Sequence, residues 1–137
     1  MRTAIKDKIE AISPDDQATH RDVFTLVDLR RRDGASMRIA DRHFALDLME
    51  VDSTRLITPN SQTITYALRV FYSAETGVDD RIAKDAERVL DALYSLHTED
   101  ADIARADAGP VQISETVVEG LLEATTAVAV TYLVTGV

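Results

Sequence analysis

The sequence predicts an α+β domain in which helices pack on one face of an antiparallel or mixed sheet, in the order α-β-β-α-β-β. Three observations carry this prediction. Residues 63–72 alternate apolar and polar side chains, as a strand with one face in the core does. Residues 79–96 repeat apolar side chains every three or four positions, which is the spacing of an amphipathic helix. Residues 121–134 alternate again. We expect residues 1–137 to form one domain.

A short helix is expected over residues 4–12, with Thr3 as its N-cap and Ile5, Ile9 and Ile12 on one face. Pro14 should end it, because proline disfavours the helical conformation in the residue before it.

Residues 17–41 form the least regular region of the sequence. Residues 22–28 could be a short strand, and Asp33-Gly34 is a dipeptide typical of hairpin turns. Two interpretations fit this region: a solvated loop, or an arm that docks on an acidic partner such as the next copy of the same protein. It holds the only basic patch of the sequence, made of Arg30, Arg31, Arg32 and Arg38.

The next two elements should be neighbouring strands. Residues 42–50 alternate, with Phe44, Leu46 and Leu48 on one face, and residues 51–61 would form a long connecting turn. The strand over residues 63–72 is expected at the centre of the sheet, because its second face is only partly polar. A helix should cover its apolar face.

The strongest predicted helix spans residues 79–96. Asp79 and Asp80 suit its N-terminus, where both a cap and the helix dipole favour a carboxylate. We expect it to pack back onto the preceding strand, since only about six residues separate the two. Its apolar stripe consists of Ile82, Ala86, Val89, Leu90, Leu93 and Leu96.

The last third of the chain should supply two more strands. Residues 98–100 close the helix, residues 103–107 form a short strand, and residues 111–120 are an acidic connection with a possible half-strand. In the final strand one face is apolar, and the other carries small or polar side chains, as expected for close packing or for a neighbouring subunit. This second face holds Glu123, Thr125, Ala127, Ala129 and Thr131.

Composition excludes several classes of protein. The net charge of −9 argues against ordinary DNA binding, which requires cations to neutralise phosphates. The chain lacks cysteine, so disulfides and thiolate metal sites are impossible. No apolar run approaches the roughly 18 residues of a membrane span, and the start of the chain lacks a secretory signal. We therefore expect a cytoplasmic protein.

Catalytic and metal-binding motifs are not found. His20, His43 and His97 share no metal-ligand spacing, and no P-loop, dinucleotide fingerprint or nucleophile elbow occurs. Adjacent acids such as Asp15-Asp16 point apart, so they suit caps and loops rather than acid–base catalysis. A loose divalent-cation site could be imagined only at Glu99, Asp100 and Asp102. We expect no enzyme, no cofactor and no metal.

Four segments resemble the tail terminator, or tail-completion, proteins of long-tailed phages and gene transfer agents. They read ALRVFYSAETGVDDRIAKDAERVLDALYSL, DIARADAGPVQISE, GLLEATTAVAVTYLV and, at the start, MRTAIKDKIEAISP. The resemblance covers nearly the whole chain and is weakest at residues 17–41. It implies a structural virion protein of the tail or neck, assembled in the host cytoplasm. Six copies would form a ring that ends polymerisation of the tail tube and joins the tail to the head.

The resemblance also implies partners: further copies of the chain, the tail tube protein, the head–tail connector or stopper protein, and DNA passing through the pore without specific binding. An acidic wall would let such a polyanion slide. Our own hypothesis pairs the basic patch with Glu99, Asp100 and Asp102 across the subunit contact. Two alternatives stay open: another neck component, such as a connector or stopper, and a small ligand-binding α+β domain.

Overall fold

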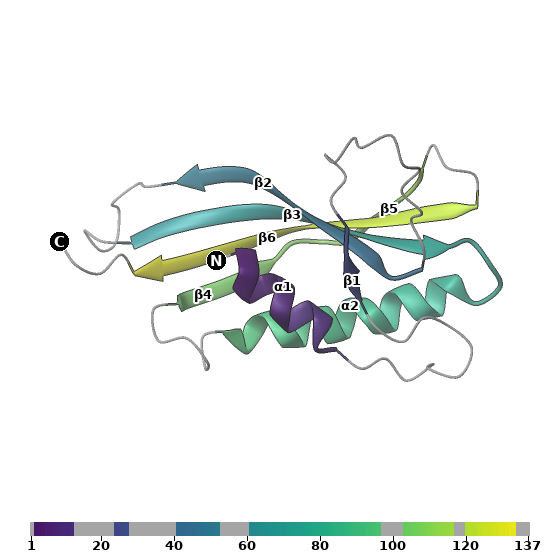
Figure 1. Ribbon diagram of the computed structural model, residues 1–137, viewed down its shortest axis with the longest axis horizontal. Helices are drawn as coiled ribbons and strands as arrows, with labels where there is room; N and C mark the ends of the chain where they lie inside the picture. Colours follow the sequence, from purple (N-terminus) through teal and green to yellow (C-terminus); the bar gives the residue numbers. More distant parts are fainter. Residues whose placement is uncertain are drawn as a thin grey trace.

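The computed structural model describes residues 2–12, 24–27, 41–52, 61–96, 103–116 and 120–133, and within them it forms an α+β fold with both helices on one face of a sheet (Figure 1). The elements are α1 (Arg2–Glu10), β1 (Thr25–Leu26), β2 (His43–Asp52), β3 (Ser61–Ser73), α2 (Val78–Tyr94), β4 (Ile103–Ala108), β5 (Gln112–Glu115) and β6 (Leu121–Leu133). The predicted fold class and the order of its long elements are confirmed. The short strands β1 and β5 lie within the two segments for which only a possible strand was predicted.

The sheet is mixed, with the strand order β1-β2-β3-β6-β4. Only β1 runs parallel to its neighbour, β2, and the other pairs are antiparallel. The final strand, β6, inserts between β3 and β4, and it also pairs with β5. β3 is therefore central, as its two alternating faces predicted. The pairing of β3 with β6 runs without a shift from Ser61 and Leu133 to Ser73 and Leu121.

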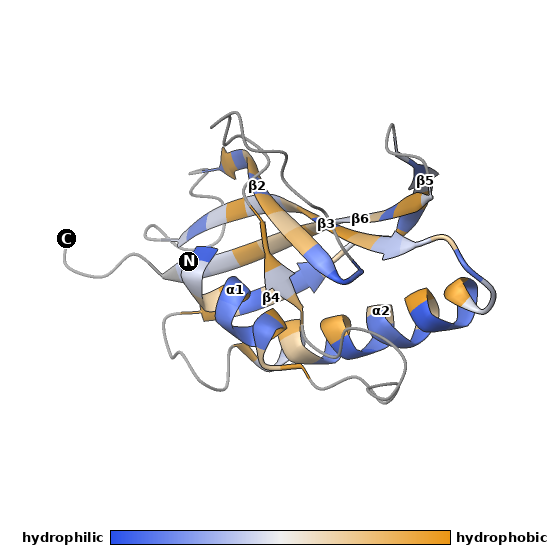
Figure 2. Cartoon of the chain, turned by 45° about the vertical axis from the view of Figure 1, so that its right-hand side comes forward, coloured by the Kyte–Doolittle hydropathy of each residue, from blue (hydrophilic) through white to orange (hydrophobic). Residues whose placement is uncertain are grey.

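The core lies between the sheet and the helices. Figure 2 shows the apolar side of α2 turned towards the strands. Ile82, Val89 and Leu93 of α2 are buried there against Leu68 of β3 and Val128 of β6. α1 contributes Ile5 and Ile9, both fully buried. A nine-residue helix is too short to persist alone, so this contact is what holds α1 in place.

The ends of several elements differ from the predictions. α1 begins at Arg2, so Thr3 lies inside the helix and cannot be its cap. α2 begins after Gly77, whose φ of 84° is left-handed, and no side chain caps it; Asp79 and Asp80 lie in its first turn. Glycine is needed there because a Cβ strains this conformation. The favourable interaction of both acids with the helix dipole remains.

β2 is longer than predicted and projects beyond the helices. It continues to Asp52, with a register shift between Leu48 and Glu50. Leu48 shares the helix-side face with Phe44 and Leu46 but is 53% exposed. Met49 and Val51 are also exposed. The apolar pattern thus predicted the face of β2 correctly, but not its burial.

Candidate functional site

The residues selected from the sequence as an interface cannot be located. Arg30, Arg31, Arg32, Arg38, Glu99, Asp100 and Asp102 all lie outside the described residues, as do His20, His97 and the Asp33-Gly34 turn. The remaining histidine, His43, is buried at the start of β2. Among the described residues, no group of three histidine or acidic side chains is placed to hold a metal ion.

A buried ion pair joins the start of β2 to the middle of α2. The Arg42 guanidinium donates from Nε to Asp85 Oδ2 at 2.7 Å and from Nη2 to Oδ1 at 3.2 Å. Both side chains are almost completely buried, at 0% and 1% exposed. The Tyr72 hydroxyl of β3 donates to the same carboxylate at 3.0 Å, and Arg88 lies 3.6 Å from it. Three cationic or hydroxyl groups therefore satisfy Asp85.

A second ion cluster lies beside the first and joins the same two segments of the chain, with the acid and the base exchanged between them. Arg81 of α2, 6% exposed, donates to Asp41 at 2.8 Å and to Glu75 at 3.1 Å. The same Asp41 oxygen accepts from the Ser73 backbone N–H at 3.0 Å. The adjacent pair Asp41-Arg42 thus binds an arginine and an aspartate that are four residues apart on α2. This reciprocal arrangement fixes how α2 is rotated against the sheet.

Backbone geometry holds Arg42 in position. Its φ of 60° is rare for a residue with a side chain, and its N–H donates to the Phe71 carbonyl at 2.7 Å. The guanidinium lies 6.0 Å from the centroid of the Phe24 ring, within the range of a cation–π contact. The strained turn before β2 is therefore held by hydrogen bonds and packing on several sides.

Sequence reasoning missed both clusters, although one signal was present. Asp85 falls three residues after Ile82 and four before Val89, so it lies in the buried stripe of α2 rather than on its charged side. An acid at such a position needs a buried cation. Which arginine supplies it depends on contacts that span 43 residues of sequence.

The cluster is built for stability rather than for chemistry. Burial raises the pKa of the Tyr72 hydroxyl well above its ordinary value of 10.0, and the neighbouring Asp85 carboxylate raises it further. The phenol therefore stays protonated and serves as a hydrogen-bond donor. Because the ion pair is enclosed, neither Arg42 nor Asp85 can reach a substrate.

Tyr72→Phe should make the free energy of unfolding depend less on pH in the alkaline range. A raised pKa in the folded state means that stability is lost as the pH rises above about 10, by about 1.4 kcal/mol per pH unit for one proton. We expect the variant to be less stable near neutral pH, by about 1–3 kcal/mol for the lost buried hydrogen bond, and the difference to narrow above pH 10. Urea unfolding between pH 8 and 11 measures both. A difference in stability between wild type and variant that stays constant across that range would contradict the raised pKa of Tyr72.

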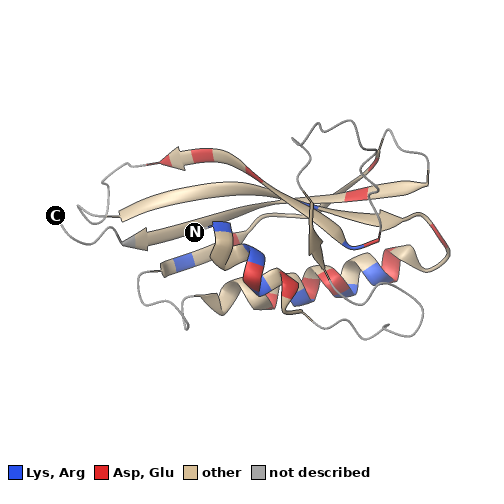
Figure 3. Cartoon of the chain, viewed as in Figure 1, with Lys and Arg blue, Asp and Glu red and all other residues tan. Residues whose placement is uncertain are grey.

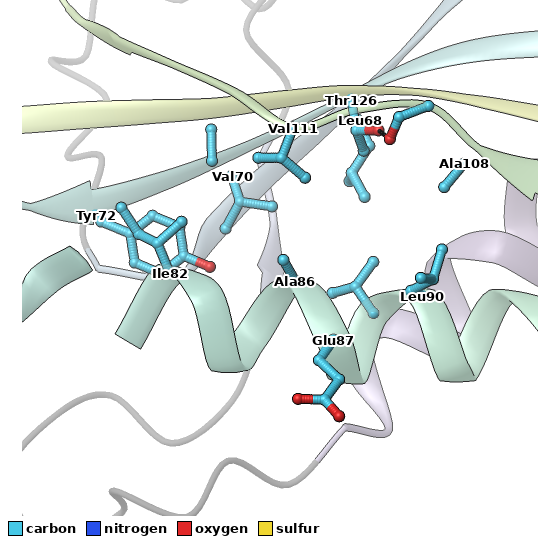
Figure 4. Close-up of a pocket in the computed structure, with 13 residues that line it drawn as sticks. Leu68, Val70, Tyr72, Ile82, Ala86, Glu87, Leu90, Ala108, Val111 and Thr126 are labelled. Carbon is cyan, nitrogen blue, oxygen red and sulfur yellow. Dashed lines mark hydrogen bonds between the residues drawn. The ribbon is translucent and has the colours of Figure 1, made fainter. Parts of the chain in front are cut away.

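An apolar cavity of about 270 Å³ lies between α2 and the sheet (Figure 4). Leu68, Val70, Ile82, Val89 and Leu90 supply much of its wall, and Ala108, Gly109 and Val111 line it where β4 gives way to β5. Figure 4 shows the carboxylate of Glu87 directed away from it. The hydroxyls of Tyr72 and Thr126 already donate to Asp85 and to the Gly109 carbonyl. The cavity therefore suits an apolar occupant.

The sheet face away from the helices carries small side chains and a charged group. In the register of β3 and β6, Thr63 faces Thr131, Thr65 faces Ala129 and Ala67 faces Ala127. Arg69 of β3 pairs with Glu123 of β6, donating from Nη2 to Oε2 at 3.3 Å, and lies 3.6 Å from Asp47. Hydrogen bonding to Arg69 lowers the pKa of the Glu123 carboxyl.

Figure 3 shows that charges gather on the helices, while β3 and β6 are almost free of them. No helix in the described part of the chain is both long enough and apolar enough to span a membrane. Comparison with models of known protein families finds no match for the chain. A search of curated proteins likewise finds no significant relative.

Proposed function

We propose that this protein is a structural virion component that forms a ring at the head-proximal end of a tail tube. The ring ends polymerisation of the tube and joins it to the head connector, while leaving a channel for DNA. The resemblance of the sequence to tail terminators motivates this function and gives six as the number of subunits. The observation that carries it furthest is that, among the described residues, the sheet has open edges with exposed apolar side chains and one face that no helix covers.

The open edges favour an assembling protein. In the described part of the chain, no strand pairs with β2 beyond Phe44 on its outer side, and none pairs with the outer side of β4. Unpaired strand edges readily pair with another chain. The exposed large apolar side chains of β2 and of the β5 region lie at these two sides of the sheet, and include Leu48, Met49, Val51, Val111 and Ile113.

The charge of the helix-free face is compatible with a DNA channel. The strand residues on this face include more acids than arginines. This excess of negative charge would repel a phosphate backbone rather than bind it. The acids are Asp47, Glu50, Asp52, Asp107 and Glu123, and the arginines are Arg69 and Arg105. Threonine and alanine side chains lie between several of these charges, in the rows of Thr63, Thr65 and Ala67.

A ligand-binding function is the second candidate, because one observation favours it: the apolar cavity beneath α2. Its polar hydroxyls are already hydrogen-bonded, so it would select an apolar compound rather than a nucleotide or a metal. The Arg42–Asp85 ion pair gives this candidate no catalytic group, since both side chains are almost completely buried.

Deleting the gene from its parent element tests the proposal. We expect overlong tails together with filled heads that lack tails, because tube growth would no longer be stopped. Electron microscopy of the particles measures tail length and head attachment, and a plasmid copy of the gene should restore both. Free tails of normal length would instead assign the protein to the connector side of the neck. Intact particles in normal number would contradict any structural role and leave the cavity as the functional site.

A further inference from the structure

The rows of the sheet run from one open edge to the other. The row through Leu48 of β2 continues through Tyr66 of β3 and Val128 of β6 to Ala108 of β4. Residues in one row share a face of the sheet. Leu48 is 53% exposed at one edge, and Ala108 lies at the other edge in the wall of the apolar cavity. One row therefore begins at an exposed apolar side chain and ends at an apolar recess.

A second row, on the helix-free face, joins opposite charges. It starts at Asp52 of β2, passes through Thr63 and Thr131, and ends at Arg105 of β4. Asp52 is exposed, and the Arg105 side chain is 74% exposed. Arg105 also pairs with Asp107 at 2.5 Å, which leaves most of the guanidinium in solvent. The acid and the base lie at opposite edges, so they can meet only between copies.

The strand directions allow the β2 edge of one copy to meet the β4 edge of another when the two copies are related by a rotation. Along β2, β3, β6 and β4 each strand is antiparallel to the one before it. If a second copy is placed beside the first by rotation about an axis along the strands, its β2 runs antiparallel to β4 of the first copy. The alternation then continues without a break. Repeating a contact between different surfaces closes a ring when the rotation divides a full turn.

We propose that β2 of one copy pairs with the β4 edge of the next, and that this contact builds the ring. The inference rests on the proposed ring function and names its subunit interface. Continuing the rows across the contact places Leu48 of one copy beside Ala108 of its neighbour, at the mouth of the cavity. It places Asp52 beside Arg105, so this row joins opposite charges across the contact. The adjacent row places Glu50 beside Asp107, whose carboxylate is already paired with Arg105.

The cavity is large enough for this occupant. An engineered cavity of about 150 Å³ admits benzene, so about 270 Å³ has room for an aliphatic side chain. Val111, 41% exposed, extends the apolar surface at its rim. Both edge strands also have a register shift near the same end, between Leu48 and Glu50 and between Ile103 and Arg105. Such bulges bend strands and are frequent at the rims of barrels.

Cysteine cross-linking tests the contact directly, because the chain has no cysteine of its own. A variant carrying both Asp52→Cys and Arg105→Cys should form a ladder of covalent oligomers under mild oxidation. The two positions are three strand spacings apart in one copy, about 14 Å, which is too far for a disulfide within the chain. Each single variant should give at most covalent dimers. Lys84→Cys with Arg105→Cys is the matched control, and it should give no ladder.

Non-reducing gels and native mass spectrometry of the wild type separate the possible failures. A wild type that forms rings, with a double variant that folds but yields no ladder, would overturn this interface and leave the proposed function standing. A wild type that stays monomeric both alone and with isolated tail tubes would overturn the interface and the ring together. As a second measurement, Leu48→Lys should shift the assembly to monomers. Tyr94→Lys, which replaces another exposed apolar residue, should not.

Discussion

Asp85→Asn should destabilise the folded protein by about 3–5 kcal/mol, because it removes the charge of the buried carboxylate that the Arg42 guanidinium contacts. Asparagine matches aspartate in size, so packing is preserved and only the charge changes. The Arg88 and Tyr72 contacts would also weaken, since both depend on the same carboxylate. A loss of this size is a large part of the roughly 5–15 kcal/mol that stabilises a typical domain. Urea unfolding followed by circular dichroism measures it.

Asp91→Asn provides the matched control. Asp91 lies on the same helix but is exposed, so its replacement should change the free energy of unfolding by less than about 0.5 kcal/mol. Equal effects from the two variants would show that the buried pair contributes no more than a surface charge. Replacing Arg42 and Asp85 together by apolar residues should be less damaging than Asp85→Asn alone, because both members of the buried ion pair would then be removed together.

Leu68→Ala should cost about 2–5 kcal/mol of stability, whereas Leu48→Ala should cost little. Both leucines lie on the helix-side face of the sheet, but Leu68 is 1% exposed and Leu48 is 53% exposed. Leu68 already borders the apolar cavity, so its truncation would enlarge an existing space. The change in the urea concentration at the midpoint of unfolding measures the difference. This comparison requires that the unfolding free energy depends equally steeply on urea in each variant.

The same two variants separate folding from assembly. Leu48→Ala should retain the stability of the monomer but weaken the association of copies, because Leu48 is the residue that enters the neighbouring cavity. Leu68→Ala should lower stability while leaving the surface of β2 unchanged. Size-exclusion chromatography with light scattering at several concentrations measures the association. A Leu48→Ala protein that associates as tightly as wild type would contradict its placement in the interface.

The two ion clusters connect stability with assembly. Asp41, Arg42, Arg81 and Asp85 fix α2 against the beginning of β2 and the end of β3, close to Tyr72 and Ile82 in the cavity wall. A cavity that receives a side chain from a neighbouring copy needs walls that keep their spacing. Charged pairs specify one orientation of the helix, whereas apolar packing alone tolerates several.

Periodicity determined the long elements because each is decided locally. The strand over residues 63–72 and the helix over residues 79–96 appear at nearly the predicted positions, as β3 and α2, since alternation and the three-to-four spacing each fit one backbone geometry. The boundaries were less certain. The start of α2 depends on the left-handed backbone of Gly77 rather than on Asp79 or Asp80. A carboxylate near a helix start can act as a cap or through the dipole, and the sequence does not separate the two.

The candidate sites could not be predicted from local patterns in the sequence. The sequence directed attention to its most basic segment, whereas the described charged clusters use arginines that stand apart in the chain. The alternation placed Leu48 on one face with Phe44 and Leu46, yet only a neighbouring element can bury a residue, and Leu48 is 53% exposed. The sequence shows that Asp85 falls within the apolar stripe of α2, but it does not show that Arg42 is its partner.

The amino-acid sequence by itself determined the fold class, the order of the long elements and the face of each that turns to the core, because side-chain periodicity acts over a few residues. Only the tertiary structure decided that Arg42 binds Asp85, that β6 lies between β3 and β4, and that a cavity remains beneath α2. These features depend on contacts between residues far apart in the chain. No local pattern encodes such contacts, since many pairings satisfy the same periodicity and packing selects one of them.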